Sequence, residues 1–175
     1  MEEILRDRNR QLEKTELIGL CRKDMELLSS YYQKEITAMH IAVRTSLPDN
    51  PLFIDGNAEQ LGKTIMSLLN NGMYAIAKKY GKKAYPAEIG LALESKDGQA
   101  VIRLYDNGVG IEQSILDKIF DPFFTTKTTG EAAGIGLYLS KEIILNHHGQ
   151  IAVRSEKDEL TEFTITLPLW EEKSV

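Results

Sequence analysis

The sequence has little of what defines several protein classes. Cys21 is the only cysteine, which excludes a disulfide framework and a thiolate metal site. No apolar run approaches the length of a membrane span, and the charged start MEEILRDRNR does not resemble a signal peptide. Basic residues number 21 against 26 acidic ones, and the net charge of -5 argues against nucleic acid as a partner. We therefore expect a cytoplasmic domain that does not itself insert into a membrane.

The 175 residues, 42% of them hydrophobic, suffice for one domain with its own core and an additional helix. Residues 1–16 are dominated by charge and predict a solvated helix or the end of a coiled coil. The predicted organisation is a helical stub over 1–21, a domain over 22–170 and a tail over 171–175.

The segment 61–80 predicts the central helix. Its apolar residues recur at helical spacing and form one stripe: Leu61, Ile65, Leu68, Leu69, Gly72, Ala75 and Ile76. A second line of side chains follows the edge of that stripe: Ser67, Asn71, Tyr74 and Lys78. A half-buried amide at Asn71 is either a satisfied structural group or a ligand for something held against the helix.

Other segments predict a mixed sheet with helices. Alternation over 36–47 predicts a strand that carries His40 on its polar face. Asn57 is placed to cap the central helix, with Gln60 in the position of a capping box. The remaining expected elements are hairpin strands at 88–95 and 99–105, a helical piece at 113–119, a helix over 135–147 closed by Gly149, and strands at 151–155 and 162–167.

Three further segments carry chemistry, and each also has a structural interpretation. Asp106-Asn-Gly-Val-Gly110 follows an apolar strand, so its carboxylate could accept a hydrogen bond from an amine such as that of adenine; it is also ordinary turn chemistry. Gly134-Ile-Gly136 opens a helix, whose free N–H groups suit phosphate. Between them, Phe120-Asp-Pro-Phe-Phe-Thr-Thr-Lys127 combines aromatic anchors with hydroxyls and a cation that could fold over phosphates.

The order of these motifs resembles the N, G1, F and G2 boxes of the sensor histidine kinase catalytic domain, over roughly residues 22–170. FDPFFTTK is similar to the version in nitrogen-regulation-type sensor kinases. The resemblance implies the Bergerat fold of the GHKL superfamily. That fold is α+β, a two-layer sandwich in which three helices cover one face of a mixed sheet of about five strands. It also implies ATP and Mg²⁺ as cofactors, and transfer of the γ-phosphate to a histidine on a partner domain of a two-component pathway.

The resemblance assigns roles by position. Asn71 would coordinate Mg²⁺, Asp106 would bind the adenine amine, and Lys127 would act in the lid over ATP. Asn71 and Lys127 are the expected catalytic residues. The expected nucleotide-binding set comprises Ser67, Asn71, Tyr74, Lys78, Asp106, Gly108, Gly110, Ile111, Phe120, Thr125, Thr126, Lys127, Gly134, Ile135, Gly136 and Leu137.

The sequence departs from the family pattern in three places. Ser67 stands where the family usually has a second Asn, and it cannot act as the general base of an efficient ATPase. Ala132 and Ala133 replace the expected Gly-Thr before the last glycine motif. The phosphoacceptor box is absent, and His40, His147 and His148 are not credible acceptors. The alternatives are a non-catalytic nucleotide-binding module, which these changes favour, and a serine kinase of the anti-sigma-factor type, against which FDPFFTTK speaks.

The resemblance further implies a histidine phosphoacceptor domain and a response regulator as partners. The chain would then be the catalytic fragment of a longer kinase, or would receive its substrate on another chain. Its location would be the cytoplasm, including the case of a cytosolic part of a membrane-bound sensor.

Overall fold

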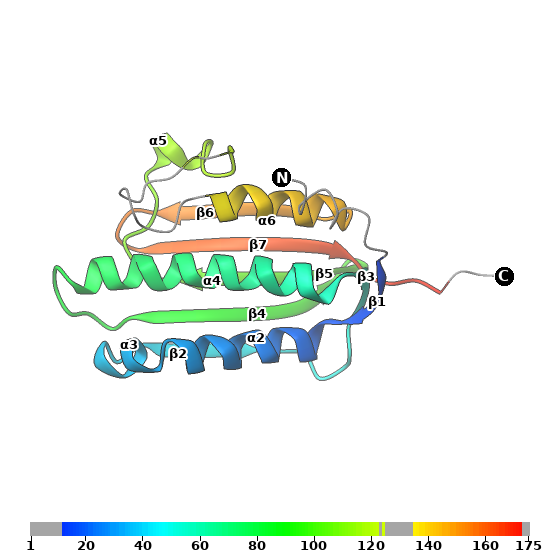
Figure 1. Ribbon diagram of the computed structural model, residues 1–175, viewed down its shortest axis with the longest axis horizontal. Coiled ribbons are helices and arrows are strands. Elements are labelled where there is room, and N and C mark those ends of the chain that lie inside the picture. Colours follow the sequence, from blue (N-terminus) through cyan, green and yellow to red (C-terminus); the bar gives the residue numbers. More distant parts are fainter. Residues whose placement is uncertain (1–11, 123, 125–134, 173–175) are drawn as a thin grey trace.

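The computed structural model describes residues 12–122, 124 and 135–172, which form a sheet covered on one face by helices (Figure 1). The helices are α2 (Leu17–Tyr31), α3 (Gln33–Ala38), α4 (Ala58–Tyr80), α5 (Gln113–Leu116) and α6 (Ile135–Asn146). The strands are β1 (Glu13–Glu16), β2 (Ala42–Ser46), β3 (Phe53–Gly56), β4 (Glu88–Lys96), β5 (Gln99–Asp106), β6 (Gln150–Glu156) and β7 (Leu160–Pro168). In the described ranges, no helix combines the length and apolarity that a bilayer span needs.

The main sheet has five strands in the order β2-β4-β5-β7-β6. Only the β2–β4 pair is parallel, and the other neighbours are antiparallel. Strands β1 and β3 form a separate antiparallel ribbon. The predicted α+β fold, with a mixed five-stranded sheet and helices on one face, is confirmed.

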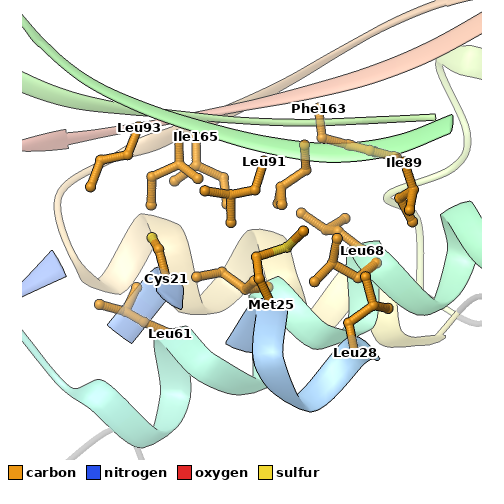
Figure 2. Packing of buried hydrophobic residues seen from close by; sticks show 14 of the residues in the cluster. Cys21, Met25, Leu28, Leu61, Leu68, Ile89, Leu91, Leu93, Phe163 and Ile165 are labelled. Atoms are coloured by element: carbon orange, nitrogen blue, oxygen red, sulfur yellow. The ribbon is translucent and has the colours of Figure 1, made fainter. Parts of the chain in front are cut away.

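The core lies between the sheet and the helices α2, α4 and α6 (Figure 1). Figure 2 shows side chains of α2 and α4 pointing at side chains of β4 and β7 across this layer. The predicted stripe of the central helix supplies much of it, since Leu61, Ile65, Leu69 and Ile76 are each at most 2% exposed. Burial of this stripe is the main reason that α4 forms, because apolar area removed from water stabilises by about 25 cal/mol per Å².

The predicted N-cap at the start of α4 is confirmed, whereas the backbone N–H that a capping box would pair with Gln60 has His147 as its partner. The Asn57 side chain accepts a hydrogen bond from the backbone N–H of Gln60 at 3.0 Å, which makes Asn57 the N-cap. The backbone N–H of Asn57 in turn donates to Nε2 of His147 at 2.9 Å. The second ring nitrogen, Nδ1, lies 2.7 Å from the Ile143 oxygen, so His147 links the end of α6 to the start of α4. This buried structural role agrees with the expectation that His147 is not a phosphoacceptor.

Two secondary-structure predictions in the first half of the chain are wrong. Residues 13–16 form strand β1 and not a helix, because their backbone pairs with β3. The predicted strand over 36–47 is helix α3 followed by the shorter strand β2, and His40 lies between them in a left-handed turn with φ of 52°. At the end of α6 the predicted closure is confirmed, because the Gly149 N–H donates to the Ile144 oxygen at 3.0 Å, with His148 before it in a left-handed conformation with φ of 61°.

Helix α2 packs into the same core as the sheet. Leu17, Cys21 and Leu28 are fully buried, although the first two precede the predicted boundary at residue 22. Burial raises the pKa of the Cys21 thiol to about 12, so this cysteine acts as a small apolar side chain.

Asp24 on α2 is a buried carboxyl, 4% exposed, whose Oδ2 has no hydrogen-bond partner in the described structure. Burial raises the pKa of Asp24 from 3.8 to about 6. The protein therefore loses stability as pH rises through this window, because the folded state disfavours the charged form. We expect Asp24→Asn to raise the free energy of unfolding at pH 7.5 by about 1–3 kcal/mol.

Urea denaturation at pH 7.5 and at pH 4 measures this effect. The gain should shrink at the lower pH, because folded wild-type protein then carries Asp24 in its neutral form. The exposed Asp49→Asn is the matched control. If Asp24→Asn raised the free energy of unfolding equally at both pH values, the raised pKa of Asp24 would be contradicted as the cause.

Candidate nucleotide-binding site

A cavity of about 600 Å³ opens between α4, the loop after β5, α5, α6 and the turn joining β6 to β7. This volume is in the range of pockets that bind small ligands. Its walls are Asn71, Tyr74, Ala75, Lys78, Lys82, Asp106, Val109, Gly110, Ile111, Glu112, Ile115, Ile119, Phe124, Leu137, Lys157, Asp158, Thr161 and Phe163. Half of these residues are apolar and half are polar or charged, a mixture that suits a flat, largely apolar ring with a charged extension.

Asp106 lies at the end of β5 and is 5% exposed. Its Oδ1 accepts a hydrogen bond from the backbone N–H of Gly108 at 2.9 Å. Burial raises the pKa of Asp106 from 3.8 to about 7, against the opposing effects of that hydrogen bond and of the Lys79 charge. A buried carboxylate in a cavity wall is a strong acceptor for a ligand amine, since few competing waters reach it.

The loop after β5 is pressed between α4 and the β6–β7 turn. The backbone N–H of Val109 donates to the Ala75 oxygen at 3.2 Å, and the Val109 oxygen accepts from the backbone N–H of Asp158 at 2.6 Å. A Cβ on Gly108 would lie 2.5 Å from the carbonyl carbon of Ala75, so only glycine permits this close approach. Gly110 has φ of 72°, a conformation that glycine adopts without strain.

The predicted line of side chains on α4 reaches the cavity over part of its length. Asn71, Tyr74 and Lys78 all line the cavity wall. Ser67, one turn before Asn71, is half-buried and is not among the described lining residues. The neighbouring Asn70 is exposed, and its Oδ1 accepts a hydrogen bond from the Tyr32 hydroxyl at 2.8 Å. Adjacent amides on α4 thus have different surroundings.

The aromatic motif contributes in two ways. Phe124 lines the cavity, in keeping with the expectation that it docks into an apolar slot. Phe120 is outside the described lining and packs edge-to-face on Phe163, with ring centroids 6.3 Å apart. The expected lid residues Thr125, Thr126 and Lys127, together with Gly134, lie outside the described residues.

The other predicted residues lie in the cavity wall or behind it. Ile111 and Leu137 line the cavity. Gly108 is outside the described lining, and its lack of a side chain lets the loop after β5 approach α4 closely. Ile135 and Gly136 form the first positions of α6. Backbone N–H groups at a helix start are free to bind anions.

Sequence reasoning missed several wall residues. Thr161 stands opposite Asp106 in the β5–β7 register, and its hydroxyl lies 2.8 Å from that of Ser155. Lys157 and Glu112 face each other at the cavity with 3.1 Å between Nζ and Oε1. Lys82 lies in the turn that follows the end of α4 at Tyr80, so the helical period does not indicate its place. The Thr161 pairing has no local signal, because its partner strand is distant in sequence.

In the described ranges, no group of three or more His, Cys, Asp or Glu side chains is placed to hold a metal ion. Asn71 is the amide in the cavity wall. One amide oxygen suits a hard cation that receives most of its ligands from phosphates and water.

The sheet order, the three covering helices and the cavity beside a strand-end aspartate define an ATP-binding domain of the Bergerat type. The chain belongs to the family described as "Histidine kinase-, DNA gyrase B-, and HSP90-like ATPase", whose sequence profile matches residues 56–171. The relatives that match it in sequence are named as kinases, one of them a histidine-protein kinase, and the solved structures that share its fold belong to histidine kinases.

Sporulation kinase D of Bacillus subtilis (strain 168) is 34% identical over 123 residues, which cover 70% of this chain and 22% of that protein. Signal transduction histidine-protein kinase AtoS of Escherichia coli (strain K12) is 39% identical over 122 residues, which cover 69% of this chain and 19% of that protein. The chain thus spans about a fifth of the length of these two curated relatives.

Solved structures share the fold. The catalytic domain of histidine kinase ThkA superposes with a TM-score of 0.72 at 22% identity, covering 91% of this chain and 96% of that one. The mycobacterial sensor histidine kinase MprB superposes with a TM-score of 0.73 at 20% identity. The match covers 90% of this chain and 98% of that one.

Proposed function

We propose that this chain is the ATP·Mg²⁺-binding catalytic domain of a two-component sensor kinase, which donates the γ-phosphate of ATP to a histidine on a separate phosphoacceptor domain. The observation that carries the proposal is the single cavity in which Asp106 of β5 and Asn71 of α4 are both wall residues. A response regulator would then receive the phosphoryl group from that histidine. The cytoplasm, where ATP is available, is the proposed location.

The base would lie in the inner part of the cavity. Asp106 accepts the adenine amine, with Ile111, Ile119 and Phe163 as apolar neighbours of the ring. Gly108 and Gly110 hold the loop that shapes this part. The buried acceptor selects adenine, because a purine with a carbonyl at this position would face the carboxylate with a second acceptor.

The triphosphate would run toward the start of α6 and along α4. Gly134, Ile135, Gly136 and Leu137 bring helix N–H groups to the phosphates, and Lys127 with Thr125 and Thr126 covers them; these are proposals from the motif. On α4, Tyr74 and Lys78 line the cavity on the side of Asn71. Mg²⁺ would be held by Asn71, phosphate oxygens and water, where it neutralises charge on the transferred group.

The extent of the domain is also a proposal. The burial of Leu17 and the pairing of β1 with β3 favour a catalytic domain that starts at about residue 13, before the predicted boundary at residue 22. The part before β1 would lead to the phosphoacceptor domain. The last residues, 171–175, remain proposed as a tail.

A transfer assay tests the function. The chain is mixed with γ-labelled ATP, Mg²⁺ and a separate helical hairpin that carries a phosphoacceptor histidine. We expect acid-labile, base-stable label on the hairpin, and none when its histidine is replaced. Tight ATP binding without transfer to any hairpin tested would instead support the non-catalytic module.

A further inference from the structure

The ammonium group of Lys79 stands where three segments around the cavity meet. Lys79 is half-buried near the end of α4, and its Nζ donates to the backbone oxygens of Asp158 at 2.5 Å and Asn107 at 3.3 Å. The same Nζ lies 4.3 Å from the ring centroid of Tyr85. Figure 1 shows the corresponding ends of α4, β5 and the β6–β7 turn at one end of the molecule.

These contacts hold the parts that position Asp106. Asn107 directly follows Asp106, and its side chain fixes the start of β4: Oδ1 accepts from the Glu88 N–H at 2.7 Å, and Nδ2 donates to the Pro86 oxygen at 2.8 Å. Asp158 is a cavity residue whose N–H binds the loop after β5. The Lys79 ammonium group thus links the loop after β5, which follows Asp106, to the β6–β7 turn.

We propose that Lys79 is a positioning residue for nucleotide binding, which docks the β6–β7 turn onto the loop after Asp106 and keeps that carboxyl in the ionised form that accepts the adenine amine. This inference rests on the proposed function, in which Asp106 binds the base. Lys79 itself is not among the described cavity residues, so it acts through its neighbours.

Lys79 supplies the cationic part of the surroundings that keep Asp106 ionised. Burial disfavours the carboxylate, whereas the hydrogen bond from the Gly108 N–H and, after it, the Lys79 charge lower the pKa of Asp106. From the loop before β4, Tyr85 faces Asp106, and that carboxylate is one of the causes that raise the Tyr85 pKa to about 12. Glu159 in the β6–β7 turn also faces Lys79. The other charged groups of the described cavity wall are Lys78, Lys82, Glu112, Lys157 and Asp158.

The test measures the affinity for ATP by calorimetry between about pH 5.5 and about pH 8.5 in the wild type and three variants. Lys79→Met keeps the apolar stem without charge, Lys79→Arg keeps the charge, and the exposed Lys83→Met is the matched control. Titration of the phosphates affects all four proteins alike. We expect Lys79→Met to move the midpoint of the pH profile upward by about 0.5–1 unit, so that affinity near pH 6.5 falls about three- to tenfold and the loss narrows at high pH.

The expected profiles of Lys79→Arg and Lys83→Met keep the wild-type midpoint. If Lys79→Met lost the same factor of ATP affinity at every pH, or if Lys79→Arg shifted the midpoint, the electrostatic role of Lys79 would be overturned. If Lys79→Met does not fold, Lys79→Gln, which removes the charge but keeps a hydrogen-bond donor, takes its place and should show the same upward shift of the midpoint. Wild-type protein that fails to bind ATP at any pH would refute the proposed function instead.

Discussion

Asp106→Asn is expected to weaken ATP binding by about 10- to 100-fold while making the nucleotide-free protein more stable. The first effect follows from replacing a buried charged acceptor by an amide whose N–H₂ end opposes the adenine amine. The second follows from removing a carboxylate that burial disfavours. These opposite signs distinguish a ligand-binding group from a structural one, whose removal lowers stability.

The stability effect depends on pH. The folded-state pKa of Asp106 is raised from 3.8 to about 7, so the wild type loses stability as pH rises through that window. We expect Asp106→Asn to unfold at higher temperature than the wild type at pH 8, by an amount equivalent to about 2 kcal/mol or more, and to lose most of this gain at pH 4.

Calorimetric ATP titration and thermal denaturation measure the two effects on the same samples. Asp97→Asn is the matched control, because Asp97 is exposed in the turn between β4 and β5, with φ of 53°, which asparagine also adopts. A destabilised Asp106→Asn protein with wild-type ATP affinity would assign Asp106 to the structure of its turn.

The second large effect is expected for Asn71→Ala. Loss of the amide removes the proposed protein ligand of Mg²⁺, and transfer to a phosphoacceptor hairpin should fall by about 100-fold or more. Affinity for ATP without Mg²⁺ should change far less, because the base is held elsewhere. The rate of label transfer at several Mg²⁺ concentrations measures this difference.

Asn70→Ala provides a control of the same residue type on the same helix. Asn70 is exposed, and its described contact is with the Tyr32 hydroxyl, away from the cavity wall. We expect this variant to keep its transfer rate within about twofold. Equal Mg²⁺ dependence in Asn71→Ala and the wild type would remove Asn71 from the metal site.

Periodicity and local chemistry predicted the elements on which the cavity is built. The apolar stripe of α4, the cap at Asn57 and the hairpin of β4 and β5 each depend on residues close in sequence. Asn71 and Asp106 were found for the same reason, one on the edge of a helical stripe and one at the end of an apolar strand. Their meeting in one cavity was implied only by the resemblance to the kinase family.

The features that the sequence did not predict are those whose conformation or position depends on contacts between segments distant in sequence. Strand β1 is charged and four residues long, and its conformation is set by β3, about 40 residues away. The position of Thr161 depends on the register between β5 and β7, and the contacts of Lys79 depend on where the β6–β7 turn docks. Such contacts are tertiary, and single-segment patterns do not predict them.

The most direct measurement of the adenine assignment compares ATP with ITP, in which a carbonyl replaces the 6-amino group. The affinities of both nucleotides are determined for the wild type and for Asp106→Asn. We predict that the wild type prefers ATP by at least about tenfold and that Asp106→Asn loses this preference. A wild type that binds ITP as tightly as ATP, or a variant that keeps the full preference, would contradict adenine recognition by Asp106.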